Sequence, residues 1–334
     1  MNIFLLVSIF FTSFVGIYIL MKYADKLGLL DIPNERSMHK VLTPRGAGIA
    51  FVSSIFIVLF FLDIEYLKTY YYIYLAIAII FFVGMWDDVQ DVSPKIKFIF
   101  IFFSTLTLYL NDFGIYSLGT YMGYEVILPY SWLVFLFTFF AMAGYINALN
   151  LMDGLDGLAA SISMVILVTF LAIGWQHNDE LIISLSSFFI ITLMVFLLFN
   201  WHPAKVFMGD SGSLTLGVVI VILAIQSVQY ITPTSVLFII ALPLLDTFIV
   251  MTRRIQRGQS PFQADKNHMH HFLFNVKGDI RYTVIILVMM QIVFSLIGYQ
   301  IGQADDMLSL ILFLLLFYIY LNLFDQRLKR RHGK

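Results

Sequence analysis

The sequence predicts an all-α, polytopic integral membrane protein that forms a single domain over residues 1–334. Composition is the first reason: 60% of the 334 residues are hydrophobic, 12% are charged, and the mean hydropathy is +0.89. A soluble protein of this length cannot bury so much apolar surface. The second reason is that apolar runs long enough to cross a bilayer recur along the whole chain.

About eleven such runs define the expected transmembrane helices in chain order. The first is uncharged and has no small-residue cleavage site after it, so it is expected to stay as a membrane helix. Several others contain Gly, Ser or Thr, as packed membrane helices do. The runs are 2–21, 46–62, 70–86, 96–110, 131–149, 157–175, 181–199, 211–229, 234–252, 281–301 and 307–324.

The basic residues predict how these helices are oriented. With eleven spans, the C-terminal tail shares a side with the connections after spans one, three, five, seven and nine. That side holds nineteen of the 20 Lys and Arg residues, and only Lys68 lies on the other side. Because Lys and Arg concentrate in cytoplasmic loops, we expect the N-terminus outside and the C-terminus in the cytoplasm.

Composition also excludes some chemistry. The chain has no cysteine, which excludes disulfides and thiolate chemistry. The formal net charge is −1 and no basic stripe with interleaved aromatic residues occurs, so we expect no nucleic acid as a partner.

The stretch Asn147–Gly157, NALNLMDGLDG, carries two amides and two carboxylates between two apolar runs. Such side chains are costly in or near hydrocarbon. They stand at every third position, as Asn147, Asn150, Asp153 and Asp156, so adjacent pairs share a helix face. Nearby carboxylates repel unless a cation or a donor-rich ligand lies between them. The pattern therefore indicates a metal or nucleotide site, and the alternative is a capped loop, since Asn and Asp are common in turns.

A carboxylate pair, Asp87 and Asp88, ends the third run and is followed by Lys95 and Lys97. Neighbouring helix residues point about 100° apart, so one carboxylate can hold a metal while the other takes a proton. Carboxylates at a membrane boundary with lysines one or two turns later suit a metal–phosphate site. The alternative is a solvated helix end.

The segment from Asn200 to Ser213, NWHPAKVFMGDSGS, joins two runs. Pro203 ends a helix, and the glycine-rich turn that follows opens the next one. A helix N-terminus suits an anion, and Asp210 offers a hard oxygen ligand for Mg²⁺ in the same place. For Asp210 alone, a helix N-cap is the alternative.

The connection 253–281 carries arginines and a histidine row, with Arg254, His268, His270 and His271 as candidates. Arginines and histidines together suit a phosphate clamp. A zinc site is the competing interpretation, and it is disfavoured because adjacent histidines chelate poorly together and no thiolate joins them. The arginines also fit a simple topological role.

The polar clusters all fall in connections that are predicted to be cytoplasmic. Lys40, in the first of them, belongs either to the site or to a charged loop that enforces topology. A cation-coupled carrier is the rival from another class, but it would place acids near the midplane of both halves, and Asp246 is the one clear mid-span acid here. The connections are 22–45, 87–97, 147–157, 200–212 and 253–281.

These clusters, in this order, resemble a known family, the polyprenyl-phosphate N-acetylhexosamine-1-phosphate transferases, which are relatives of phospho-N-acetylmuramoyl-pentapeptide translocase. The likeness covers most of the chain, and NxxNLxDGxDG followed by FMGDxGS is highly specific. The matching motifs are DIPNERSMHKVLTPRGAG (31–48), GMWDDVQDVSPKIK (84–97), NALNLMDGLDGLAA (147–160), NWHPAKVFMGDSGSLTLG (200–217) and PLLDTFIVMTRRIQRGQSPFQADKNHMHH (243–271).

The resemblance implies a function. Members transfer a sugar-1-phosphate from a UDP-sugar to undecaprenyl phosphate, release UMP and require Mg²⁺, for which Mn²⁺ is a substitute. The last loop resembles the subfamily that uses UDP-GlcNAc to start cell-surface polysaccharides. Met269 interrupts the three consecutive histidines of the peptidoglycan enzymes, which use UDP-MurNAc-pentapeptide. We therefore expect a multi-pass transferase of the bacterial inner membrane whose active site faces the cytoplasm, with a homodimer left open.

The resemblance also assigns roles. It implies that Asp210 and the carbonyl oxygen of Asn150 hold Mg²⁺, with Asp88 as a further candidate. Asp87 is the better candidate to assist the lipid phosphate, but which of the two neighbours is the base stays open, as does direct attack against a phospho-enzyme. The substrate-binding candidates are Lys40, Lys95, Lys97, Asp153, Asp156, Asn200, Arg254, His268, His270 and His271.

Overall fold

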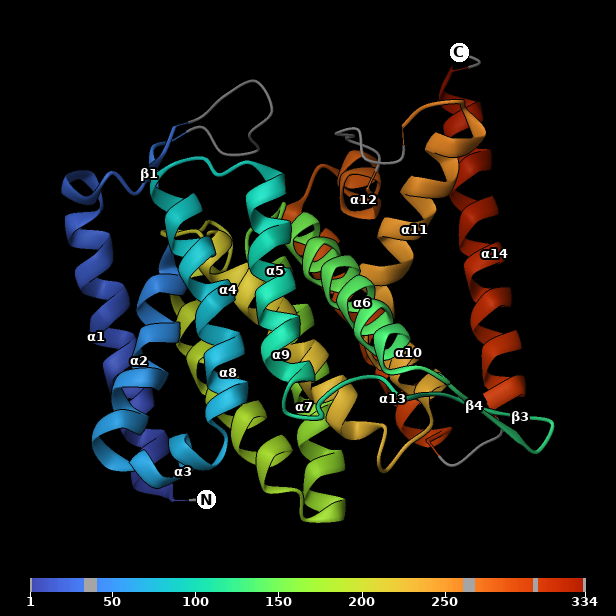
Figure 1. The fold of residues 1–334 in the computed structure, drawn as a ribbon. Coiled ribbons are helices and arrows are strands. Elements are labelled where there is room, and N and C mark those ends of the chain that lie inside the picture. The colour runs from blue at the N-terminus through green and yellow to red at the C-terminus, as the bar shows by residue number, and fades with distance from the viewer. Residues whose placement is uncertain (1, 33–40, 261–267, 303–305, 333–334) are drawn as a thin grey trace.

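The computed structural model describes residues 2–32, 41–260, 268–302 and 306–332, with side chains up to residue 322 in the last helix. The protein is a bundle of helices with two short antiparallel hairpins (Figure 1). The strands pair as β1 (Leu30–Asp31) with β2 (Thr43–Pro44), and β3 (Ser117–Tyr121) with β4 (Tyr124–Ile127). The helices are α1 (Ile3–Leu27), α2 (Ala47–Leu62), α3 (Ile64–Thr69), α4 (Tyr71–Val89), α5 (Pro94–Tyr109), α6 (Ser131–Met152), α7 (Leu158–His177), α8 (Glu180–Asn200), α9 (Asp210–Ser227), α10 (Pro233–Ile239), α11 (Ala241–Gln256), α12 (Met269–Lys277), α13 (Ile280–Gln300) and α14 (Asp306–His332).

A helix or a helix pair lies over each predicted apolar run. Within the described residues, seven helices are long and apolar enough to cross a membrane, or eight if α10 and α11, bent by 85°, form one span. The helices α2 and α5 have 16 residues each, which at about 1.5 Å per residue is shorter than a hydrocarbon core of about 30 Å. The chain is thus an all-α polytopic membrane protein, while the count of eleven stays a prediction.

The buried centre of the bundle is α9, which packs against α4, α6, α2 and α7. Its residues from Ser211 to Ala224 are all buried and are apolar or small on every side, as in a helix that is surrounded by others. Gly48 of α2 lies so close to α9 that a Cβ on it would overlap the backbone nitrogen of Gly212. Gly217 meets Ile146 of α6, where a Cβ would lie 2.8 Å from the Ile146 Cα. Small residues thus let neighbouring backbones fix the position of α9.

The two ends of the bundle carry different connections (Figure 1). The β1–β2 hairpin, α12 and the end of α14 lie at one end, while α1 begins at the other, where the β3–β4 hairpin also lies. The start of α1 and the end of α14 are therefore at opposite ends, as an odd number of spans requires. Which end faces the cytoplasm stays a prediction from the charge distribution.

Candidate active site

A cavity of about 630 Å³ opens where the ends of α4, α6, α8 and α9 meet. Its size is within the range of small-molecule and nucleotide sites. Segments far apart in the sequence contribute to its wall, and they include most of the polar clusters predicted above. The carboxylates that line it are Asp31, Asp87, Asp88, Asp153, Asp156 and Asp210, and the polar or basic groups among them include Arg45, Asn150, Asn200, His202 and His271.

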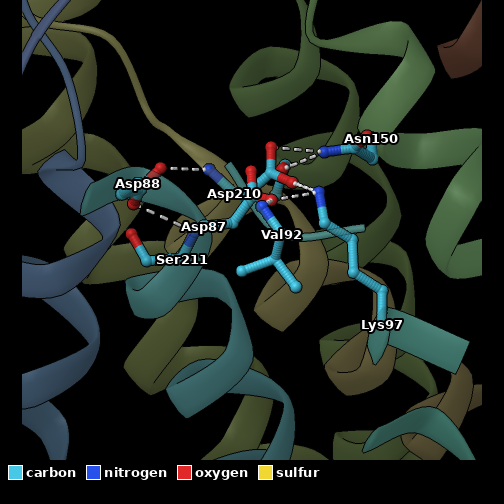
Figure 2. A network of polar contacts seen from close by, with 8 residues as sticks. Asp87, Asp88, Val92, Lys97, Asn150, Asp210 and Ser211 are labelled. Carbon is cyan, nitrogen blue, oxygen red and sulfur yellow. Dashed lines mark hydrogen bonds and ion pairs between the residues drawn. The ribbon is translucent and has the colours of Figure 1, made fainter. Parts of the chain in front are cut away.

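Asp88, at the end of α4, is buried and caps the first turn of α9 (Figure 2). Its two carboxylate oxygens accept hydrogen bonds from the backbone N–H groups of Asp210, at 2.7 Å, and of Ser211, at 3.1 Å. Unpaired N–H groups at a helix N-terminus favour such a partner. The anion predicted for this helix end is thus a carboxylate of the chain itself, and Asp88 positions Asp210.

Two glycines make this contact possible. Gly209, which precedes α9, has φ 75°, a conformation that favours glycine, and a Cβ there would collide with the Asp88 carboxylate. Gly84 lies one turn before Asp88, and a Cβ there would be 2.6 Å from the carbonyl oxygen of Asp210. Direct packing of α4 on the α9 backbone therefore sets the distance between the two helices.

Asp87 points elsewhere, as the angle between neighbouring helix positions predicts. One of its carboxylate oxygens accepts a hydrogen bond from the Val92 N–H at 2.9 Å and lies 2.8 Å from the Lys97 ammonium nitrogen (Figure 2). Its side chain is 17% exposed and lines the cavity. Asp87 is therefore accessible to a ligand, whereas Asp88 is occupied by backbone groups.

Asp210 lies at the centre of the polar network in Figure 2. One carboxylate oxygen accepts from the Asn150 side-chain NH₂ at 3.0 Å, and the other is 2.5 Å from the Lys97 Nζ. The same NH₂ also donates to the Ser213 hydroxyl at 2.8 Å. The Asn150 carbonyl oxygen, implied by the resemblance as a Mg²⁺ ligand, would face this point after a half-turn of the amide.

The donor set fits a cation that binds few protein groups. Oxygens of Asp87 and Asp210 converge on one cationic atom, the Nζ of Lys97. Mg²⁺ is held by one or two carboxylates and completed by water and substrate phosphates. Among the described residues, no group of three or more His, Cys, Asp or Glu side chains is arranged to hold a metal. The residues therefore fit Mg²⁺ better than an all-protein zinc cage.

The carboxyl of Asp153, the residue that directly follows α6, has a raised pKa. Enclosure among the helix ends raises the pKa of its carboxyl to about 7, and the negative charges of Asp210, Asp88 and Asp156 raise it further. Both effects disfavour the ionised form. At neutral pH, both the protonated and the ionised forms of the Asp153 carboxyl are therefore populated.

Asp156 and Asn200 join the two polar segments that the sequence analysis treats separately. Asp156 accepts a hydrogen bond from the Ala204 N–H at 3.1 Å and lies 2.6 Å from the His202 Nδ1. The Asn200 side chain accepts from the Gly157 N–H and donates to the Val206 carbonyl, both at 2.8 Å. These contacts hold 153–157 against 200–206 and shape one wall of the cavity.

His202 is a cavity residue that the sequence analysis missed. Arg281, at the start of α13, donates two hydrogen bonds to its backbone carbonyl, at 2.9 and 3.1 Å. Its position inside the polar segment 200–213, next to Pro203, was the available signal. Arg45, at the end of the first predicted cytoplasmic connection, also lines the cavity.

The histidine row is held by α11. The buried carboxylate of Asp246 accepts from the Met269 N–H at 2.7 Å and lies 2.8 Å from the His268 Nδ1. Asp246 is the acid that a cation-coupled carrier would use at mid-span. Here its carboxylate instead holds the start of the histidine row in place. His270 is buried, and its ring fills the space above Gly154, where a Cβ would be 2.6 Å from the ring nitrogen.

Burial lowers the pKa of His270 to about 3, so its imidazole is neutral at physiological pH. It therefore cannot act as a cation toward a phosphate. His271, by contrast, lines the cavity.

Several predicted residues lie apart from the cavity wall. Arg254 is buried in α11, and Lys95 is exposed at the start of α5. Neither is among the lining residues, and neither are His268 and His270, although His271 is. Lys40 falls outside the described residues.

Comparisons with known proteins identify the family of this chain. The sequence profile of glycosyl transferase family 4 matches residues 70–228, from α4 to the end of α9. The undecaprenyl-phosphate alpha-N-acetylglucosaminyl 1-phosphate transferase of Yersinia pestis is 32% identical over 334 aligned residues, which cover 94% of this chain and 89% of the relative. The Escherichia coli K12 protein of the same name is 31% identical over 339 residues, with the same coverage.

A relative in Bacillus subtilis strain 168, named a probable undecaprenyl-phosphate N-acetylglucosaminyl 1-phosphate transferase, is 32% identical over 311 residues, which cover 90% of this chain and 85% of the relative. The three alignments cover 90–94% of this chain. The resemblance inferred from the motifs is confirmed, and the chain belongs to glycosyl transferase family 4.

Proposed function

We propose that this chain is a phosphoglycosyltransferase that moves GlcNAc-1-phosphate from UDP-GlcNAc to undecaprenyl phosphate and releases UMP. The proposal rests on one observation above all, which is that Asp87, Asn150, Lys97 and Asp210 form one network beside a nucleotide-sized cavity at the end of a membrane helix bundle. A lipid acceptor arrives within the bilayer and a UDP-sugar arrives from water. A site at the helix ends is open to both.

Phosphoryl transfer depends on alignment and charge neutralisation more than on covalent chemistry by the protein. An oxygen of the lipid phosphate attacks the sugar-bearing phosphorus, a new P–O bond forms, and the bond to the leaving UMP breaks. Asp87 is the partly exposed carboxylate that orients the acceptor or takes its remaining proton. Because the second pKa of a phosphate is about 6, the acceptor is already largely ionised, and orientation is the larger contribution.

Mg²⁺, or Mn²⁺ in its place, would neutralise the charge of the donor diphosphate when bound. Asp210 would hold it, with Asp87 and Asn150 beside it. Asp88 keeps Asp210 in place through the first turn of α9. Asp153 and Asp156 are the candidates for the uridine side of the donor, and His271 and Lys97 for its phosphates.

Two alternatives are less well supported. A carrier needs buried acids that are free to titrate, yet in the described part of the chain Asp88, Asp179, Asp246 and Asp306, the buried acids, each accept hydrogen bonds from fixed donors. A UDP-MurNAc-pentapeptide transferase is the rival within the class. Met269, which interrupts the histidine row, argues against it.

The decisive experiment is a substrate panel. Purified protein is incubated with undecaprenyl phosphate, Mg²⁺ and one UDP-sugar at a time, and UMP and the lipid product are measured by mass spectrometry. We expect product from UDP-GlcNAc and none from UDP-MurNAc-pentapeptide. Product from the pentapeptide donor alone would assign the other reaction, and no UMP from any donor would remove the transferase proposal.

The sidedness is tested separately. We propose a bacterial inner-membrane location with the cavity facing the cytoplasm, because nineteen of the 20 Lys and Arg residues fall on that predicted side. Reporters fused after Lys334 and inserted in the connection 253–281 should both report cytoplasm. A periplasmic signal from the tail would contradict the eleven-span topology and the one-sided site.

A further inference from the structure

Lys97 occupies the position between the two carboxylates nearest the proposed cation site. It stands in the first turn of α5, and its Nζ lies 2.8 Å from an oxygen of Asp87 and 2.5 Å from an oxygen of Asp210 (Figure 2). The side chains of the three residues are 21%, 17% and 22% exposed. The ammonium is therefore held in a semi-enclosed place where two acids meet.

The charges explain why a cation is needed there. Two carboxylates that approach one atom repel each other unless a positive charge lies between them. Asp88 and Asp153, which line the same cavity, add to this repulsion. Lys97 supplies the compensating charge from a different helix, and it ties α5 to the start of α9.

A divalent cation held by Asp210 with Asp87 beside it, as proposed above, would need the space that the Lys97 ammonium occupies between these oxygens. Mg²⁺ binds carboxylate oxygens at about 2.0–2.1 Å, and an ammonium hydrogen-bonded to both oxygens occupies the intervening space. Mg²⁺ and the Lys97 ammonium therefore cannot both lie between Asp87 and Asp210 at the same time. Lys97 has a flexible four-carbon stem and carries a point charge, so it can turn away while α5 stays in place.

We infer that Lys97 is the resident counter-ion of the cation site, that a divalent cation displaces it, and that the freed ammonium then pairs with the donor diphosphate. This inference rests on the proposed function, because it takes Asp210 as the cation ligand. It adds that cation binding and phosphate binding are coupled through one lysine. Lys97 is thus a positioning residue toward the cation and a binding residue toward the phosphates.

Substitutions at Lys97 distinguish two effects on Mn²⁺ affinity. One is displacement of the Lys97 ammonium by the cation, and the other is general repulsion between two positive charges. Lys97→Met removes the competing ammonium, and we expect Mn²⁺ to bind roughly tenfold more tightly, a change of about 1.4 kcal/mol. Lys97→Arg keeps the charge, but a guanidinium pairs with carboxylates in two places and is harder to displace, so Mn²⁺ should bind more weakly than in wild type. If only the positive charge mattered, Lys97→Arg would bind Mn²⁺ with the affinity of wild type.

The measurement is titration of the detergent-purified full chain with Mn²⁺, with the free ion followed by electron paramagnetic resonance and no nucleotide present. Lys26→Met, at the end of α1, is the matched control, because it removes one charge at the same end of the bundle away from these carboxylates. It should bind Mn²⁺ as wild type does. Unchanged or weaker binding by Lys97→Met would overturn the inference.

The variant Asp210→Asn distinguishes failure of the proposed cation site at Asp210 from failure of the proposed displacement of Lys97. If this variant binds Mn²⁺ more weakly and Lys97→Met binds it as wild type does, only the displacement is wrong. If neither variant changes the affinity, the cation site itself is misplaced and both proposals about it fail.

A second readout needs no substitution. Wild-type protein is treated with an amine-acylating reagent, with and without Mn²⁺, and the modified lysines are identified by mass spectrometry. We expect labelling of Lys97 to rise with Mn²⁺, while that of Lys26 stays constant. Equal labelling of Lys97 in both conditions would contradict release of its ammonium.

Discussion

The two ends of the bundle hold their carboxylates in different ways. At the cavity, Asp87 and Asp210 share the Lys97 ammonium, which we propose that a divalent cation displaces. At the opposite end, Asp306 accepts from the Thr120 N–H at 2.7 Å and from the Thr234 hydroxyl at 2.6 Å, and Asp179 accepts from the Ile182 N–H at 2.8 Å. Buried carboxylates whose two oxygens are both bound by fixed groups stabilise the fold. Asp87 and Asp210 are partly exposed and share the Lys97 ammonium, so they are the carboxylates that we expect to take part in chemistry.

This comparison assigns a structural role to two acids that the sequence offered as functional candidates. Asp88 and Asp246 are buried and accept backbone hydrogen bonds, as Asp306 does. By this criterion they position other groups, and Asp87 and Asp210 are the carboxylates that we expect to meet ligands. The following predictions sharpen or break the distinction, and they run from the largest expected effect to the smallest.

The largest effect is expected for Asp210→Asn. Loss of the charge that holds the cation should lower turnover by about 10³-fold or more, and the shape of the side chain hardly changes. The melting temperature in detergent should stay near that of wild type. Near-normal turnover at ordinary Mg²⁺ would mean that Asp210 only begins a helix.

Neighbouring Asp87 and Asp88 should respond differently. Asp87→Asn should lower turnover by roughly 10²-fold while UDP-GlcNAc binding and melting temperature stay close to wild type. Asp88→Asn places an NH₂ group against the N–H groups of α9, so the protein itself should lose about 2 kcal/mol of stability. Calorimetric titration with UDP-GlcNAc and thermal denaturation test both halves. The distinction fails if Asp87→Asn is the less stable variant.

Asp306→Asn tests the opposite end. Its buried carboxylate accepts from two backbone N–H groups and a hydroxyl, and the amide cannot satisfy all three, so we expect a loss of about 2 kcal/mol of stability. Turnover per folded molecule should be unchanged. A fall in turnover at equal folded fraction would show that this end of the bundle contributes to the reaction.

A smaller effect on affinity is expected for Asp156→Asn. If Asp156 contacts the nucleotide, donor binding should weaken by about 1–3 kcal/mol, the value for a charged hydrogen bond. His202→Asn, which removes the imidazole beside Asp156, should weaken it less. Calorimetry with UDP-GlcNAc measures both, and wild-type affinity in Asp156→Asn would leave Asp156 a purely structural link to Ala204.

The smallest effect concerns pH. The pKa of Asp153 is about 7 in the folded chain and 3.8 ordinarily, so folding disfavours its ionised form. Its contribution to stability is therefore fully present below pH 3.8 and is lost as pH rises through 7. Asp153→Asn should melt at a higher temperature than wild type at pH 8, and the difference should shrink toward pH 4. A difference independent of pH would contradict the raised pKa.

Sequence patterns predict the helices and the polar segments well, for local reasons. Apolar runs of spanning length mark the helices, and the angle between successive helix residues separates Asp87 from Asp88. Recurrent Asn and Asp between apolar runs mark a site because such groups are costly near hydrocarbon. The residues Asn150, Asp153, Asp156 and Asp210, predicted from these patterns, line one cavity.

Partners across the fold are not predictable in the same way. Whether Asp88 binds a ligand or caps a helix depends on Asp210 and Ser211, whose backbones come close only after α4 and α9 pack. The pairing of Asp246 with His268, and the burial that keeps His270 neutral, depend on the bend between α10 and α11 and on Gly154. No local pattern contains these distances.

The Asp88 cap also sets a time at which the site comes into existence. Asp88 and the N–H group of Asp210 are 122 positions apart in the chain. At about 5–20 residues per second, the ribosome needs roughly 6–24 s to synthesise the intervening chain. Throughout that interval the nascent α4 carries a carboxylate whose partners have not yet been made. The growing chain therefore inserts several helices before it can hold a cation or a nucleotide in this place.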